Sequence, residues 1–177
     1  MQKIGNLRLG ALLIIILINS FTWGTIVRLS AIKCHSDDLK FCVVDKCEMK
    51  TLSRRLKEVH AVVKLLKIPV TNASIRAELL RGSLSLYNFE FDGCQYWVNK
   101  RRNPFVSAIY KLFNLYRYTN VNHSCPYSHD IVLNHMPFDT NLNTQVPLGN
   151  GNYDVVMYWF AYKVLRATIT ISMEVVN

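Results

Sequence analysis

The chain has few of the residues that mark fibrous or disordered proteins. Its 177 residues include 7 Gly and 5 Pro, which excludes a collagen-like or low-complexity chain. It also has no internal repeat, no CxxC pair and no GxSxG, so no thioredoxin-like, paired-zinc or serine-hydrolase motif is present. What it does have is 8 Phe, 9 Tyr and 3 Trp and a hydrophobic content of 50%, enough for the core of one globular domain.

A long hydrophobic run occurs once, at the N-terminus. The first eight residues contain Lys3 and Arg8 and no acid, the next ten (LGALLIIILI) are almost wholly apolar, and small or polar residues follow up to Gly24. This order is typical of a secretory signal peptide, so we expect residues 1–24 to be removed and residues 25–177 to form one secreted domain. The alternative is an uncleaved membrane anchor, which the polar residues at the end of the stretch disfavour.

Acidic residues are scarce. The chain has 12 Asp and Glu against 21 Lys and Arg, and removal of residues 1–24 leaves 19 basic and 12 acidic residues, a formal charge of +7. A basic chain favours anionic lipid, nucleic acid or acidic proteins as partners, and export makes nucleic acid the least expected of these. Solubility alone is the other interpretation. Two clusters stand out: Lys100-Arg101-Arg102, and Arg54-Arg55 with Lys57.

Five cysteines are present, at positions 34, 42, 47, 94 and 125. In an oxidising compartment cysteines form disulfides, and an odd number leaves one thiol free or paired between chains. The spacing does not choose the pairing. Two Asn-x-Ser triplets, at Asn72 and Asn122, are candidate glycosylation sites of an exported protein.

The hydrophobic pattern predicts mainly strands. Between Ala167 and Val175 apolar and polar residues alternate strictly, as a half-buried antiparallel strand requires. Further strands are expected at 59–66, 75–79, 87–91 and, as one long aromatic run, 153–165. Turn signals separate these runs, which favours an antiparallel, immunoglobulin-like two-sheet sandwich or open cup, or a barrel.

One segment has helical spacing instead. Asn103 can cap a helix and Pro104 suits its first position, and apolar residues from Phe105 to Tyr116 then form a single stripe. We predict one helix over about 104–117 that covers an edge or mouth of the sheets.

Residues 122–130 (NHSCPYSHD) are the strongest candidate for chemistry, because they contain His, Ser, Cys and Asp. Catalysis needs a nucleophile beside an oriented base, and neighbours in sequence do not establish that geometry. Zinc binding by His123, Cys125, His129 and His135 matches no common ligand spacing. We therefore expect a disulfide-anchored loop, no enzymatic activity, no metal and no cofactor.

Aromatic residues exceed what a small sandwich needs for its core, and as a set they suit the walls of an apolar pocket between two sheets. The lysine and arginines at 100–102, beside the predicted helix, are candidate contacts for an anionic headgroup. A solvated turn is the other interpretation of that basic cluster. The pocket candidates are Tyr87, Phe89, Phe91, Phe105, Phe113 and Trp159, and the aromatic surplus also includes Tyr96, Trp97, Tyr158, Phe160 and Tyr162.

Several short motifs occur in a fixed order along the chain. They are Lys33-Cys34 and Lys46-Cys47, KIPVTN at 67–72, FDGC at 91–94, NVNHSCPY at 120–127, and VPLG at 146–149 followed by GNY at 151–153. On these motifs the chain resembles an insect-expanded family of small secreted proteins of unknown function related to the chemosensory CheB proteins. That family is in turn distantly similar to the ML lipid-recognition proteins and the ganglioside activator, which are two-sheet cups around a hydrophobic ligand.

The resemblance covers roughly residues 30–177 and implies a secreted binding protein for a lipid or another hydrophobic small molecule, with chemosensation or pheromone response as its setting. It implies disulfides between Cys34 and Cys47 and between Cys94 and Cys125, with Cys42 unpaired. The predicted helix is longer than the lipid-recognition fold leads us to expect. A module that docks to a receptor or another extracellular protein, with a filled core and no pocket, is the alternative function.

Overall fold

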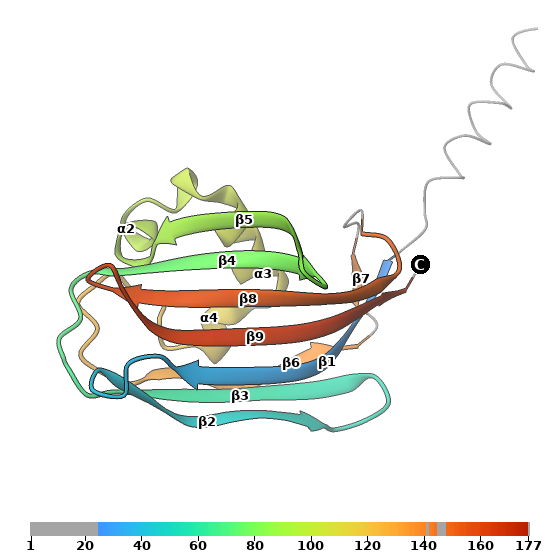
Figure 1. The fold of residues 1–177 in the computed structure, drawn as a ribbon, viewed down its shortest axis with the longest axis horizontal. Helices are drawn as coiled ribbons and strands as arrows, with labels where there is room; N and C mark the ends of the chain where they lie inside the picture. Colours follow the sequence, from blue (N-terminus) through green and yellow to red (C-terminus); the bar gives the residue numbers. More distant parts are fainter. Residues whose placement is uncertain (1–24, 141, 145–147, 177) are drawn as a thin grey trace, which may run out of the picture.

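The computed structural model describes residues 25–140, 142–144 and 148–176 (Figure 1). The expected signal peptide at 1–24 lies outside the described residues, as does the Val-Pro pair of the VPLG motif at 146–147. Within the described residues no helix is both long enough and apolar enough to cross a membrane.

Two antiparallel sheets make up most of the described chain, which confirms the mainly β prediction. The larger sheet has the order β5-β4-β8-β9-β1-β7 and the smaller one the order β2-β3-β6. The strands are β1 (Thr25–Ser36), β2 (Cys42–Thr51), β3 (Leu56–Leu65), β4 (Ala73–Arg81), β5 (Leu84–Asp92), β6 (Ile131–Asp139), β7 (Leu142–Thr144), β8 (Gly151–Ala161) and β9 (Val164–Val176).

The expected run from 153 to 165 is not one strand. It contains β8 from Tyr153 onward, a tight turn at Tyr162 and Lys163, and the start of β9. Both turn residues have positive φ, 54° and 63°, which is the backbone that a two-residue hairpin turn needs. The sequence gives no Gly or Asn there to signal it. The Tyr162 hydroxyl, which donates to Pro69 O at 3.1 Å and accepts from Thr71 N at 3.1 Å, anchors the turn instead.

The helix predicted over 104–117 is two helices. α3 (Pro104–Leu112) begins with Pro104 in its first turn, as predicted, but the Asn103 side chain makes no capping hydrogen bond. Asn114, at φ 48°, then breaks the helix before α4 (Leu115–Tyr118). Asn is one of the few residues other than Gly that adopts this left-handed conformation readily, so the break has a local cause.

A further helix, α2 (Gly93–Val98), and a 3-10 turn, η1 (Lys100–Arg102), precede α3. Asp92-Gly93 is a typical turn pair in sequence, but here it begins α2. Figure 1 shows α3 and α4 behind the large sheet, on the side where β6 lies, and α4 contacts β6. The inner face of the large sheet is therefore covered by the small sheet and, towards β5, by helices.

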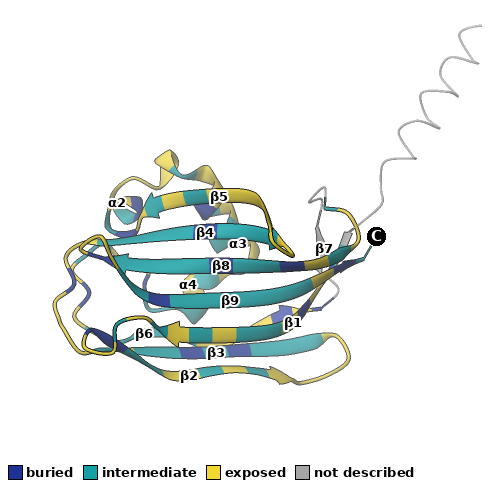
Figure 2. Ribbon diagram, viewed as in Figure 1, coloured by how far each residue is buried: buried dark blue, intermediate teal, exposed yellow. Residues whose placement is uncertain are grey.

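Buried residues gather in two clusters at opposite ends of the sheets. One cluster lies where β8 begins and includes Tyr153, Val175 and Phe138. The other lies where β8 turns into β9 and includes Phe41, Tyr127 and Ala167. Figure 2 shows that β5, at the edge of the large sheet, is mostly exposed, whereas β8 and β9 are mostly intermediate. The second cluster surrounds the cavity described next.

Candidate functional site

An apolar cavity of about 100 Å³ lies between the two sheets at the β8–β9 turn end. Its walls come from the large sheet, from the small sheet, and from the helices and loops that join them. The large sheet contributes Ala73, Ile75, Phe91, Trp159, Phe160, Ala161, Arg166, Ala167 and Ile169; the small sheet contributes Cys42, Val63, Leu65 and Ile131; helices and loops contribute Phe41, Val70, Gly93, Tyr96, Trp97, Tyr110, Val121 and Tyr127.

α2 brings two aromatic side chains, Tyr96 and Trp97, to the wall. It starts where β5 ends because the Asp92 carboxylate accepts hydrogen bonds from the backbone N–H of Cys94 and Gln95, both at 2.8 Å. Gly93 lies in the wall, and a Cβ at this position would meet the Ala73 carbonyl at 3.4 Å. An aspartate four residues before the aromatic pair can cap a helix, and this is the sequence signal from which α2 could have been predicted.

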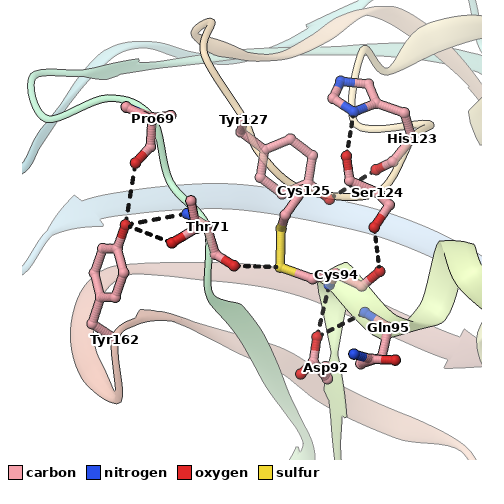
Figure 3. The surroundings of a disulfide bond; sticks show 10 residues. All are labelled: Pro69, Thr71, Asp92, Cys94, Gln95, His123, Ser124, Cys125, Tyr127 and Tyr162. Atoms are coloured by element: carbon pink, nitrogen blue, oxygen red, sulfur yellow. Dashed lines mark hydrogen bonds between the residues drawn. A yellow bond between two sulfur atoms is a disulfide. The ribbon is translucent and has the colours of Figure 1, made fainter.

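The Cys94–Cys125 disulfide ties α2 to the 119–130 loop (Figure 3). The Ser124 hydroxyl donates to Cys94 O at 2.8 Å and reinforces the link. Beyond it, Tyr127 is buried in the wall, forms a two-way backbone bridge with Val70 at 2.9 Å, and donates its hydroxyl to His123 O at 3.2 Å. Burial raises the pKa of Tyr127 to about 12, so it stays a neutral donor.

Arg166 closes the opposite side of the cavity. It sits at a bulge, since Trp159 pairs with Ala167 and Phe160 with Leu165. Its carbonyl accepts from the N–H of Asp37 and Asp38 at 2.9 and 3.2 Å, and its guanidinium stacks on Phe41 at 4.1 Å and pairs with the Asp38 carboxylate. Arg166 thus links β9 to the loop after β1.

The free thiol, Cys42, also contacts Arg166. It is 2% exposed and donates to Arg166 O at 3.3 Å. Burial raises the pKa of this thiol, which keeps it protonated and unreactive. The structure has the pairing that the resemblance implies, with Cys34 bonded to Cys47 and Cys42 left out.

The predicted pocket residues divide into three groups. Phe91 and Trp159 line the cavity. Tyr87 and Phe89 instead pack against Phe105 of α3, with ring centroids 5.8 and 4.9 Å apart, in a cluster on the exposed β5 edge. Phe113 stacks on Phe138 at 5.8 Å and borders a separate hollow of about 250 Å³ whose rim includes Asn114 and Asp139. Alternation predicts which face of a strand a side chain is on, but not whether that side chain lines a cavity or packs in a neighbouring aromatic cluster. For this reason the sequence pattern could not separate the six pocket candidates.

The basic cluster lies beside the cavity wall. Lys100 Nζ is 4.4 Å from the ring centroid of Trp97 and 5.3 Å from that of Tyr116, while Arg101 and Arg102 are exposed. The whole segment 93–118 holds five basic residues and no acid. The wall that α2 and α3 form therefore carries a positive outer surface.

The candidate catalytic segment has a structural role. Cys125 is in a disulfide and is not available as a thiolate. His123 and His129 face each other, Nε2 to Nε2 at 2.9 Å, while His135 stacks on His60 at 4.3 Å and bonds to Glu58. Across the described ranges no three His, Cys, Asp or Glu side chains gather in a group that could hold a metal ion.

The two sequons stay predictions as glycosylation sites. Asn72 and Asn122 are both exposed, as modification requires, and each lies in a loop that borders the cavity end of the molecule.

Several wall residues could not be predicted from the hydrophobic pattern, because they lie in loops without periodicity. Phe41 precedes β2, Val70 follows the β3 strand, and Val121 and Tyr127 flank the disulfide. The motifs KIPVTN and NVNHSCPY do contain three of these four residues, so the motif positions were a signal for the wall.

Comparisons with known proteins give a family match and a structural likeness. Residues 72–155 match the family described as "Protein of unknown function (DUF1091)", a span that holds α2 to α4, the Cys94–Cys125 disulfide and part of the cavity wall. This confirms the resemblance to a family of unknown function; the relation to CheB proteins stays a prediction. No curated protein matches the chain.

Among solved structures, the chain is similar to chicken MD-1 in its complex with lipid IVa. The sequences are 10% identical, the TM-score is 0.40, and the likeness covers 86% of this chain and 97% of chicken MD-1. This chain thus has a fold of two antiparallel β-sheets, and its residues 72–155 are similar to the family of unknown function.

Proposed function

We propose that the protein is a secreted carrier of a lipid or another hydrophobic small molecule, without enzymatic activity, and that its biological setting is chemosensation or pheromone response. The observation that carries the proposal is the apolar cavity between the sheets. Pockets of this kind bury apolar ligand surface, which contributes about 25 cal/mol for each Å² removed from water. Two disulfides support an oxidising, extracellular location.

The size of the cavity sets a condition on binding. At about 100 Å³ it is smaller than the roughly 150 Å³ cavity that holds one benzene molecule. A longer ligand must therefore displace part of the wall. The movable part we propose is the helical segment, because Tyr96, Trp97 and Tyr110 enter the wall from α2 and α3, whereas the opposite walls are hydrogen-bonded strands.

The positive outer surface of that segment supports a contact with an anionic headgroup. Lys100, Arg101 and Arg102 form η1, between the two wall helices. When the helices move, a headgroup at the opening would meet these cations while the chain of the ligand enters the cavity.

The alternative function, docking to a receptor or another extracellular protein, also has an observation in its favour. Tyr87 and Phe105 are 52% and 48% exposed and lie together with exposed Leu84 and Leu86 along the β5 edge. Exposed apolar patches of this kind mark protein contacts.

Native mass spectrometry on protein secreted from eukaryotic cells tests the carrier proposal. Wild type is compared with Ala167→Leu, which fills the cavity, and with Ala61→Leu, which adds the same bulk at an alanine of similar burial outside the wall (4% and 7% exposed). We expect wild type and Ala61→Leu to hold an apolar molecule that is released on unfolding, and Ala167→Leu to hold none. Failure of wild type to bind any member of a lipid and hydrocarbon library would overturn the proposal and favour the docking function.

A further inference from the structure

One buried donor in the cavity wall has no partner. Among the described residues two buried side-chain nitrogens lack a hydrogen bond, Trp159 Nε1 and Arg76 Nε. Arg76 is not part of the wall, and its Nε lies 3.4 Å from the Glu78 carboxylate. Trp159 is in the middle of the wall, since it sits on β8 between Ile75 of β4 and Ala167 of β9, and both neighbours also line the cavity.

The hydroxyls in the same wall are already engaged. Tyr96 bonds to Ser107 Oγ at 3.2 Å, Tyr110 donates to Val121 O at 3.3 Å, and Tyr127 donates to His123 O at 3.2 Å. A buried water is stable where it finds two to four polar partners. A water on the indole N–H could not receive a proton from Tyr110 or Tyr127, because both hydroxyls already donate to backbone carbonyls, so water is a poor match for this position.

The charged member of the wall is engaged as well. The Arg166 guanidinium pairs with Asp38 and donates through Nε to Ala161 O at 3.3 Å. An anionic group in the interior would compete with Asp38 for this cation. The indole N–H, in contrast, is a neutral donor that only donates, so it complements a neutral acceptor and offers nothing to an ammonium.

We propose that the cavity recognises a neutral oxygen acceptor within an apolar ligand, such as the carbonyl of a ketone, aldehyde or ester, and that Trp159 Nε1 donates to it. This inference rests on the proposed function and specifies its ligand class: an oxygenated lipid rather than a plain hydrocarbon. A carbonyl buried in an apolar pocket needs a hydrogen bond, and a plain hydrocarbon leaves the indole N–H unpaired. The unpaired indole N–H therefore favours binding of a carbonyl-containing ligand over binding of a plain hydrocarbon.

A matched pair of ligands tests the assignment. The affinities of tridecane and 2-tridecanone are measured on ligand-free secreted protein by competition with one fluorescent apolar probe. The ketone-to-alkane affinity ratio is then compared between wild type and Trp159→Phe, because the different hydration of the two free ligands cancels between proteins. Trp97→Phe, at the other tryptophan of the wall, is the control.

We expect the ratio to fall about fivefold in Trp159→Phe and to stay unchanged in Trp97→Phe. In a ¹H–¹⁵N spectrum of wild type, the indole resonance of Trp159 should also move downfield with the ketone and not with the alkane, which keeps the test valid if the variant fails to fold. Binding of both ligands with the same ratio in wild type and Trp159→Phe, and no indole shift, would overturn the assignment and leave the carrier function standing. Binding of neither ligand to wild type would overturn both.

Discussion

At the scale of single residues, Arg166 organises the closed side of the cavity. Its carbonyl accepts hydrogen bonds from backbone N–H groups of the loop after β1. Its guanidinium stacks on the ring of Phe41 and pairs with the Asp38 carboxylate. Burial alone would raise the pKa of Asp38, but the hydrogen bonds from Lys40 N–H and from the Arg166 guanidinium hold that pKa below its ordinary value of 3.8. The ionised form of Asp38 is therefore more favoured in the folded chain than in the unfolded chain.

Asp38→Asn should lower the free energy of unfolding at neutral pH, because it removes the ion pair of the carboxylate with Arg166. Because the folded pKa is depressed, the stabilisation is fully present above the unfolded value of 3.8 and is lost as pH falls through the folded pKa. Urea midpoints of wild type and Asp38→Asn should differ at pH 7 and converge below about pH 3.8. Asp45→Asn, which removes an exposed partner of Lys64, is the control and should have little effect at pH 7. A difference that persists unchanged at low pH would contradict the assignment.

At the scale of elements, alternation predicted part of the large sheet but did not predict β1, β2, β6 or β7. The regular strand at 167–175 lies within β9, and the expected strands at 75–79 and 87–91 lie within β4 and β5. Alternation failed at the ends of elements, because a backbone conformation rather than a hydrophobic pattern decides them. Asn114 and the pair Tyr162-Lys163 end a helix and a strand through positive φ. Hydrogen bonds of the Tyr162 hydroxyl with Pro69 and Thr71 hold the second of these turns.

The candidate site was predictable only in part for a related reason. Phe91 and Trp159 are in regular strands, so their place on an inner face follows from the pattern. Tyr127 is held in the wall by a disulfide-bonded loop, and Phe41 is held there by its contact with Arg166. Both are long-range contacts that no local sequence pattern encodes. The disulfide pairing itself came from the family resemblance and not from spacing.

Lys163→Gly should stabilise the β8–β9 hairpin. Lys163 has φ 63°, a conformation that costs a residue with a Cβ about 1–2 kcal/mol and that Gly adopts freely, although Gly loses more entropy on folding. We expect a net gain of about 1 kcal/mol in the free energy of unfolding, measured by denaturant titration. Lys163→Ala, which removes the same side chain but keeps the Cβ, should give no gain. Equal stability of the two variants would show that the turn is not strained.

At the scale of the whole molecule, two disulfides hold different parts together. Cys34–Cys47 joins β1 of the large sheet to β2 of the small one, and Cys94–Cys125 joins α2 to the loop that carries Tyr127. Only the second one borders the cavity wall. The fold thus separates a bond that fixes the sheets from a bond that limits how far the helical wall can move.

Removing each disulfide should therefore have two different effects. Cys94→Ala/Cys125→Ala and Cys34→Ala/Cys47→Ala should each lose about 2–5 kcal/mol of stability, seen as a lower melting temperature. Ligand exchange, followed by displacement of a bound fluorescent probe well below that temperature, should become faster in the first variant and change little in the second. Faster exchange in the second variant alone would mean that the sheets, and not the helices, open.

The central claim is that an apolar ligand occupies the space between the sheets. A crystal structure of the secreted protein, saturated with 2-tridecanone, tests it most directly. We predict continuous non-protein density in contact with Phe91, Tyr127 and Trp159, with α2 and α3 moved outward to enlarge the cavity of about 100 Å³. Density confined to the exposed Tyr87 and Phe105 edge, with the cavity unchanged and empty, would contradict the account.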